Sequence, residues 1–183
     1  MAKIILGFSG EMASGKGLAV KYIEEKYKAS SYRFSTILRD ILKVLCLEES
    51  RENIQKISTV LRKNFGEDLF SKIMKEQIKK DKNEFIAVDG IRRMEDIKYL
   101  KEIPEFKFVY LEADVEKRYE RTVKRKENAG DENKTIEKFK KDHAAEAETQ
   151  IKDLKQYADF ILENNGTEEE LFRQVDNIIN EKK

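Results

Sequence analysis

Apolar runs and helical periodicities alternate along the chain. Short apolar segments, of the kind that form buried strands, are separated by longer stretches whose apolar residues recur at helical spacing. The segments that we expect to form strands are residues 4–6, 32–34, 85–88, 106–111 and 158–162. Strands that alternate with helices and short loops are typical of a parallel sheet covered on both faces. The pattern therefore predicts an α/β fold with three layers, built around a five-stranded parallel sheet.

The longest stretch without a predicted strand is residues 35–80, which carry helical patterns throughout. Ser35 is placed to cap the first helix of this stretch, and Ser50 to start another. Further along, Thr135 is expected to start a long helix, and Thr167 opens the final helix with a capping box. The 183 residues suit one compact domain with small helical lid insertions.

The most specific motif follows the first predicted strand. Residues 10–16 read Gly-Glu-Met-Ala-Ser-Gly-Lys, and a helical period begins directly after them. A strand, the pattern G-x-x-x-x-G-K and a helix form the context of a phosphate-binding P-loop. Glycines let the backbone turn its N–H groups towards a phosphate chain, and the helix N-terminus adds positive potential. The residues that we expect to contact ATP are Gly10, Ala13, Ser14, Gly15, Lys16, Gly17 and Leu18.

Lys16 is expected to reach the β- and γ-phosphates and so to take part in catalysis. The alternative is a glycine-containing turn that happens to carry a lysine, but pattern and context both favour phosphate binding. Many P-loops place Ser or Thr directly after the lysine, where the hydroxyl binds Mg²⁺. Here Gly17 and Leu18 follow instead. Mg²⁺ would have to be held by water, by phosphate oxygens and by carboxylates elsewhere.

Asp89 is the candidate for such a carboxylate. It ends the apolar run at residues 85–88 and precedes Gly90. An acid at the end of a strand beside the P-loop strand is typical of the Walker B element, which holds Mg²⁺ directly or through water. The alternative is an ordinary turn, since Asp-Gly is common at strand ends. With the P-loop already present, the metal and catalytic role is favoured.

Charge and composition restrict the class of partner. The chain has 37 Lys and Arg against 36 Asp and Glu, so no overall field attracts a polyanion. No basic stretch is interleaved with stacking aromatic residues, which argues against nucleic-acid binding. No signal peptide and no apolar run of membrane length are present, so we expect a cytoplasmic protein without a membrane partner. We expect small nucleotide substrates, and a monomer or a small homo-oligomer.

Several stretches together resemble the nucleoside monophosphate kinase and dephospho-CoA kinase group of P-loop kinases. GEMASGKG followed by FSTILRD is similar to the adenylate kinase arrangement, and VDGIRRMED is similar to the Asp-Gly-x-x-Arg segment of that family. The resemblance implies that residues 35–80 form the acceptor-binding insertion. It also implies that Arg39 and Arg93 bind the acceptor phosphate, with Arg92 as the alternative to Arg93. Ser35 lies at a strand end on the same side and joins this set.

Two further stretches carry the resemblance. Arg118, Arg121 and Arg125 share one helix face where the family has lid arginines that stabilise the transferring phosphoryl group, so residues 118–134 would form a lid. A plain solvated face is an equally good interpretation of this stripe. The ending ADFILENNGTEEE resembles dephospho-CoA kinases, which implies that Asn165 and Gly166 lie near the adenine of ATP.

The sequence thus predicts a kinase that uses ATP and Mg²⁺ and transfers the γ-phosphoryl group to a nucleotide, as nucleoside monophosphate kinases do. Dephospho-CoA kinase is the first alternative. Those kinases typically supply an aspartate just after the second strand, whereas this chain has no acid there before Asp40. Asp89 could still act as the base from the neighbouring strand. The second alternative is an NTP-binding regulatory protein with little phosphotransfer, which Leu18 and Ala13 in the loop would suit.

Overall fold

A single parallel sheet forms the centre of the computed structural model, which describes residues 3–125, 135–143 and 146–181. Its strands lie in the order β2-β3-β1-β4-β5, and every pair is parallel. The strands are β1 Ile4–Ser9, β2 Ser30–Arg33, β3 Phe85–Asp89, β4 Phe106–Glu112 and β5 Phe160–Glu163. The predicted five-stranded sheet is confirmed.

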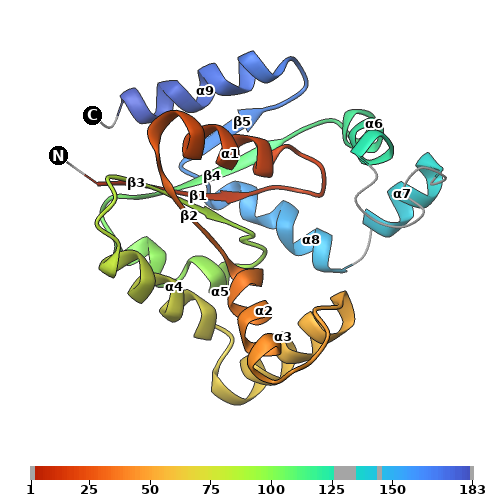
Figure 1. The fold of residues 1–183 in the computed structure, drawn as a ribbon. Helices are drawn as coiled ribbons and strands as arrows, with labels where there is room; N and C mark the ends of the chain where they lie inside the picture. Colours follow the sequence, from red (N-terminus) through yellow and green to blue (C-terminus); the bar gives the residue numbers. More distant parts are fainter. Residues whose placement is uncertain (1–2, 126–134, 144–145, 182–183) are drawn as a thin grey trace.

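Helices cover both faces of the sheet (Figure 1). Helices α1 (Lys16–Tyr27) and α9 (Glu168–Asn180) lie on one face. The other face is covered by α2 (Phe34–Val44), α4 (Leu69–Lys80) and α8 (Glu146–Asp153). The remaining helices are α3 (Arg51–Phe65), α5 (Met94–Ile97), α6 (Val115–Arg125) and α7 (Ile136–His143), with short 3-10 turns η1 (Leu100–Glu102) and η3 (Leu154–Tyr157).

Alternation along the strands builds two cores. Successive strand side chains point to opposite faces, so Ile5 packs with α2 and α4 while Ile4 and Leu6 pack with α1 and α9. β1 is buried along its whole length because it lies in the middle of the sheet with a layer of helices on each side. Each large apolar side chain buried in this way contributes about 1.5–3 kcal/mol.

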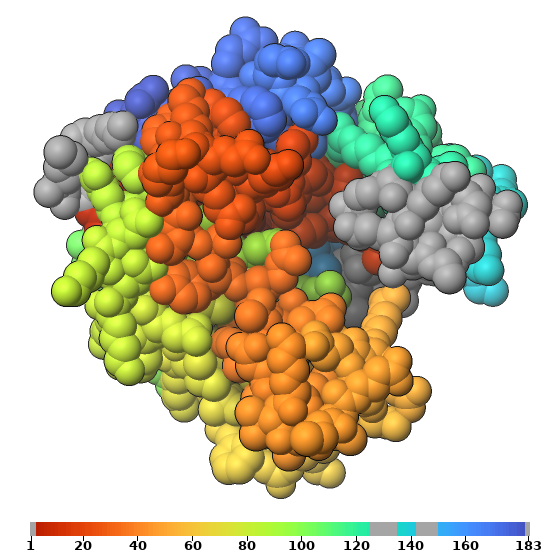
Figure 2. Space-filling model, viewed as in Figure 1, coloured from red at the N-terminus to blue at the C-terminus, as the bar shows by residue number. Residues whose placement is uncertain are grey.

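The strand register sets which residues can meet. In a parallel sheet the carboxyl ends of all strands lie at one edge, and ligands bind in the crevice beyond that edge. β3 lies between β1 and β2, so the end of β3 at Asp89 lies between the loop after Ser9 and the end of β2. Arg33 is the register partner of Asp89. In Figure 2 the surface is hollowed between α1 and the orange α2–α3 segment.

Several local predictions can be compared with these elements. The Ser50 cap is confirmed, because its side chain accepts a hydrogen bond from the N–H of Asn53, and the capping box at Thr167 is confirmed as well. The Ser35 cap is wrong: the N-cap of α2 is Arg33, two residues earlier, and its side chain makes no capping hydrogen bond. The long helix from Thr135 corresponds to α7 and α8, with residues 144–145 outside the described part.

Candidate active site

The loop between β1 and α1 wraps around the amine of Lys16. Lys16 is the first residue of α1, and its Nζ donates to the main-chain oxygens of Gly10 (2.5 Å) and Glu11 (2.9 Å). Gly10 has φ +144° and lies against β4: a Cβ at this position would be 2.3 Å from the carbonyl oxygen of Leu111. Only glycine allows this approach, so the first glycine of the motif is needed for packing as well as for turning.

Asn164 anchors the other end of this loop. It follows β5, is 4% exposed, and donates from Nδ2 to the carbonyl oxygen of Ser14 at 2.8 Å. Gly15 has φ +106°, and a Cβ there would lie 2.1 Å from the same Nδ2. The second glycine and the asparagine therefore form one close contact, which joins the C-terminal strand to the loop.

The predicted adenine-side residues lie next to this anchor rather than in it. Asn165 accepts from the N–H of Asp114 through Oδ1 (2.8 Å), which ties the turn to the start of α6. Gly166 lies against Glu170, whose carboxylate completes the capping box of α9. The contact with the loop is made by Asn164, which the sequence analysis did not single out.

The loop fits a phosphate chain. Ser14 is 1% exposed, and among the described residues its Oγ is one of the buried polar atoms that have no hydrogen-bond partner. An unpaired buried hydroxyl calls for a ligand or water, and here it lies in a loop that leads into the N-terminus of α1. Ala13 adopts the left-handed region (φ +59°), which costs a non-glycine residue about 1–2 kcal/mol. Gly17 is exposed and Leu18 packs into the core, so neither supplies a hydroxyl.

Asp89 lies at the carboxyl edge beside the loop, and it already has a cationic partner. Nη2 of Arg33 is 2.7 Å from Oδ2 of Asp89. In the part of the chain that the structure describes, no group of three or more His, Cys, Asp or Glu could hold a metal by itself. Mg²⁺ usually takes one or two carboxylates and completes its shell with phosphate oxygens and water. The single carboxylate of Asp89 next to a phosphate loop fits that requirement.

Arg118 is buried against the loop. It is 4% exposed; its Nη2 lies 3.1 Å from Oε1 of Glu11, and its other guanidinium nitrogens donate to the carbonyls of Ala113 (3.1 Å) and Met12 (3.5 Å). Lys152 of α8 approaches the same Glu11 oxygen at 3.6 Å. Two cations thus offset the charge of an acid that lies within a phosphate-binding loop. Arg118 does not lie on a solvated face.

Arg121 holds the turn after β5. Its Nη2 donates to the carbonyl oxygen (2.7 Å) and to Oδ1 (3.3 Å) of Asn164. Burial lowers the pKa of the Arg121 guanidinium. Arg125 ends α6, and its side chain lies outside the described part of the structure, as do residues 126–134 of the predicted lid.

The predicted acceptor residues are spread along α2 and the loop after β3. Arg39 pairs with Glu49 at 3.2 Å, and Arg93 pairs with Glu67, also at 3.2 Å. Both pairs are partly exposed, so each contributes only about 0–1 kcal/mol and its arginine can be recruited by a ligand. Ser35 is half-buried in the first turn of α2.

A buried ion pair fixes the loop that carries Arg92. Arg62 of α3 and Asp96 of α5 meet at 2.6 Å, with side-chain exposures of 8% and 2%. The second oxygen of Asp96 accepts from the main-chain N–H of Arg92 (3.0 Å). Arg62 also donates to the carbonyl of Glu67. Removing one member of a buried pair usually costs about 3–5 kcal/mol, so α3 is firmly attached to this loop.

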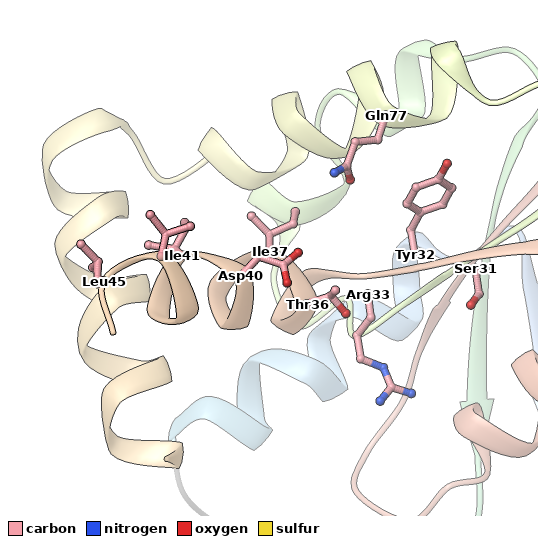
Figure 3. Close-up of a pocket in the computed structure, with 10 residues that line it drawn as sticks. Ser31, Tyr32, Arg33, Thr36, Ile37, Asp40, Ile41, Leu45 and Gln77 are labelled. Carbon is pink, nitrogen blue, oxygen red and sulfur yellow. The ribbon is translucent and has the colours of Figure 1, made fainter. Parts of the chain in front are cut away.

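A pocket of about 590 Å³ lies between α2, α4 and the end of β2. Its lining residues are Ser31, Tyr32, Arg33, Thr36, Ile37, Asp40, Ile41, Val44, Leu45 and Gln77. Figure 3 shows Ile37 and Ile41 pointing towards α4, while the Arg33 side chain extends away from them. This volume suits a small molecule, and the combination of aliphatic walls with a few polar groups is typical of ligand pockets.

The residues that the sequence did not single out differ in how much signal they carried. Arg33, Glu11 and Asn164 all lie at strand ends or in the loop, where the sequence does indicate the ligand side. Glu11 carried a usable signal, because an acid inside a phosphate-binding loop requires a cationic partner. Arg62 carried none, since its buried partner lies 34 positions away in the chain.

Comparisons with known proteins agree with this description. The model of the AAA domain family matches residues 9–140. A UPF0200 protein of Sulfurisphaera tokodaii is 28% identical over 177 residues, which cover 96% of this chain and 95% of that protein. A UPF0200 protein of Methanoregula boonei is 27% identical over 176 residues, covering 96% and 95%.

Among solved structures, a shikimate kinase from Bacteroides thetaiotaomicron superposes with a TM-score of 0.63 at 13% identity, covering 97% of this chain and 98% of that one. At this identity the likeness concerns the fold alone. Within the described residues, no helix has the length and apolarity needed to cross a membrane. The sheet, the P-loop and the matched residues together show that the chain belongs to the AAA domain family and has the fold of P-loop kinases.

Proposed function

We propose that the protein is an ATP-dependent kinase that transfers the γ-phosphoryl group to a nucleotide, in the manner of nucleoside monophosphate kinases. One observation carries the proposal: the phosphate loop, a carboxylate and several arginines meet at one edge of the sheet. Asp89 ends the strand next to the loop strand, Arg118 lies against the loop, and Arg33 lies on the other side of Asp89.

Phosphoryl transfer depends on positioning and on neutralising charge more than on covalent chemistry. Lys16 and the loop amides would bind the donor phosphates, with Arg121 positioning the turn beside them. Arg39 and Arg93 would bind the acceptor phosphate after leaving their glutamate partners. Mg²⁺, bound through Asp89, would neutralise phosphate charge. Such arginine clamps stabilise the equatorial oxygens of the transferring group.

The acceptor is proposed to carry its own anionic nucleophile. A nucleoside monophosphate needs no protein base, whereas the ribose hydroxyl of dephospho-CoA does. Asp89, one acid near the loop, is already paired with Arg33, and Asp40 is exposed on α2 within 3.7 Å of Lys43. Neither is an unpaired base at the P-loop, which favours the phosphate acceptor. We place the reaction in the cytoplasm, on small nucleotides, with a monomer or a small homo-oligomer as the working form.

A regulatory NTP-binding protein with little phosphotransfer is the second candidate. The observation in its favour is that the cations of the site already have protein partners. Lys16 donates to loop carbonyls and Arg118 pairs with Glu11. A nucleotide would have to displace these contacts, which weakens the case for fast turnover.

The test is ADP release from ATP and Mg²⁺ with a panel of acceptors. The panel contains ribo- and deoxynucleoside monophosphates, dephospho-CoA and a control without acceptor. The proposal expects strong stimulation by one nucleoside monophosphate, and Lys16→Ala should abolish it. Lys21→Ala is the matched control, because Lys21 lies on the same helix but is exposed, and its ion pair with Glu25 is a long one of 3.7 Å.

Each outcome of the panel decides between the candidates. Stimulation by dephospho-CoA alone would replace the proposed acceptor. ATP binding with no stimulation by any acceptor would favour the regulatory protein. Full turnover in Lys16→Ala would remove the P-loop from the mechanism.

A further inference from the structure

Arg33 is a cation that the sequence analysis assigned no role. It is the last residue of β2 and directly precedes α2. Its guanidinium lies 2.7 Å from the Asp89 carboxylate, which belongs to the neighbouring strand in the same register. The contact therefore follows from the sheet itself and not from a mobile loop.

The two side chains of this ion pair differ in how much of their surface is exposed. The Asp89 side chain is 11% exposed, whereas the Arg33 side chain is 55% exposed. The carboxylate is held in place by its strand, while the guanidinium lies in solvent on a long stem. Even a Cβ at Gly90 would lie 3.8 Å from Cγ of Arg33, an ordinary van der Waals distance, so this turn does not clamp the stem. Arg33 can thus leave Asp89 without moving the backbone.

Arg33 also lines the pocket between α2 and α4. Figure 3 shows its side chain at the boundary of that pocket, pointing away from the aliphatic side chains of α2. Arg33 thus contacts the carboxylate of Asp89, the candidate metal ligand, and also borders the pocket in which a small molecule would fit. Once released from Asp89, a guanidinium on this stem suits a phosphate or carboxylate group, which it can bind with two parallel hydrogen bonds.

We propose that Asp89 exchanges Arg33 for the divalent cation of the nucleotide, and that the released guanidinium binds the anionic end of an acceptor in this pocket. The acceptor class is a molecule with an apolar or flat body and a terminal phosphate. The acceptor half rests on the proposed kinase function; the exchange at Asp89 does not. Because coupling between two sites is reciprocal, Mg²⁺–nucleotide and the acceptor anion strengthen each other's binding.

The exchange is tested without turnover, by titration calorimetry with ADP. For each variant, the dissociation constant for ADP in EDTA is divided by that in Mg²⁺. Arg33→Gln removes the competitor of the metal, so this ratio should rise about fivefold or more. Asp89→Asn should lower the ratio, and the double variant should behave as Asp89→Asn does. Arg33→Lys, which keeps the charge, should stay close to the unmodified protein.

Arg173→Gln is the matched control for loss of one positive charge, since Arg173 lies on α9 and its side chain is 74% exposed. Two results would overturn the exchange: an unchanged ratio in Arg33→Gln, or a rise that persists in the double variant. The second result would show a general charge effect that does not pass through Asp89.

The acceptor half is tested with inorganic phosphate titrated into the Mg²⁺–ADP complex, followed by the ³¹P line width. Arg33→Gln should weaken phosphate binding about fivefold or more, and replacing Mg²⁺ by EDTA should weaken it in the unmodified protein. Unchanged phosphate binding in Arg33→Gln would overturn this half. If the binding results are as expected but no acceptor of the panel stimulates turnover, only the kinase proposal is removed. If an acceptor does stimulate turnover but the ratio of ADP dissociation constants is unchanged in Arg33→Gln, only the exchange is removed.

Discussion

The contact between Asn164 and the phosphate loop provides the sharpest test of how the C-terminal strand supports the site. Asn164 is buried, and its Nδ2 donates to the carbonyl oxygen of Ser14 at 2.8 Å. Asn164→Ala leaves that carbonyl without its partner and opens a space beside Gly15. A buried polar group left unpaired costs about 1–3 kcal/mol. Because about 1.4 kcal/mol is a factor of ten, the cost corresponds to roughly 5-fold to 150-fold.

The cost should appear as weaker ADP binding, because the loop conformation that carries Ser14 and Gly15 is the one that would receive the phosphates. Titration calorimetry with ADP measures it, and urea denaturation shows how much is lost as stability instead. Asn164→Asp keeps the shape but places an acceptor against the Ser14 carbonyl, so it should also weaken binding. Asn64→Ala is the control, since Asn64 is exposed and donates to the carbonyl oxygen of Val60 in its own helix.

A supporting role for Asn164 would be refuted if Asn164→Ala bound ADP as well as the unmodified protein and unfolded at the same urea concentration. That result would mean that the Ser14 carbonyl finds another partner at no cost. A loss confined to stability, with unchanged ADP affinity, would show that the loop keeps its shape without Asn164.

Two further predictions concern the loop helix and its partner helix. Gly17→Ser should stabilise α1 by about 0.5 kcal/mol, because a Cβ there meets no atom within 4 Å and serine is the better helix former; urea denaturation measures this, and calorimetry should show a larger Mg²⁺ enhancement of ADP affinity. Burial and the hydrogen bond to Asp176 raise the pKa of Tyr27 from 10.0 to about 12. The folded pKa exceeds the unfolded one, so this stabilisation is present below pH 10 and is lost as the pH rises towards 12. Between pH 9.5 and roughly 11.5, urea denaturation should show a smaller loss of stability for Tyr27→Phe than for the unmodified protein. An equal loss in both would mean that the raised pKa of Tyr27 is not its cause.

The sequence by itself was enough for the sheet and for the phosphate loop, since both depend on local information. Apolar runs separated by helical periods identified the strands, because burial on both faces makes the central strands predominantly apolar. The phosphate loop could be recognised from the sequence because its glycines and Lys16 act on backbone that is close to them in the chain. The Ser35 cap failed for the opposite reason: the strand pairing of β2 with β3 ends at Arg33 and lets α2 begin at once.

Only the tertiary structure decided which side chains surround the loop. Asn164 reaches Ser14 across 150 positions, and Arg118 reaches the loop carbonyl of Met12 across 106. Arg33 meets Asp89 because β2 and β3 are neighbours in the sheet, an order that depends on which strands pair and not on either segment alone. Periodicity indicates which face of an element is buried, but it carries no information about the partner that lies opposite. The physical reason is that these contacts are set by strand order and register, which the whole chain determines together.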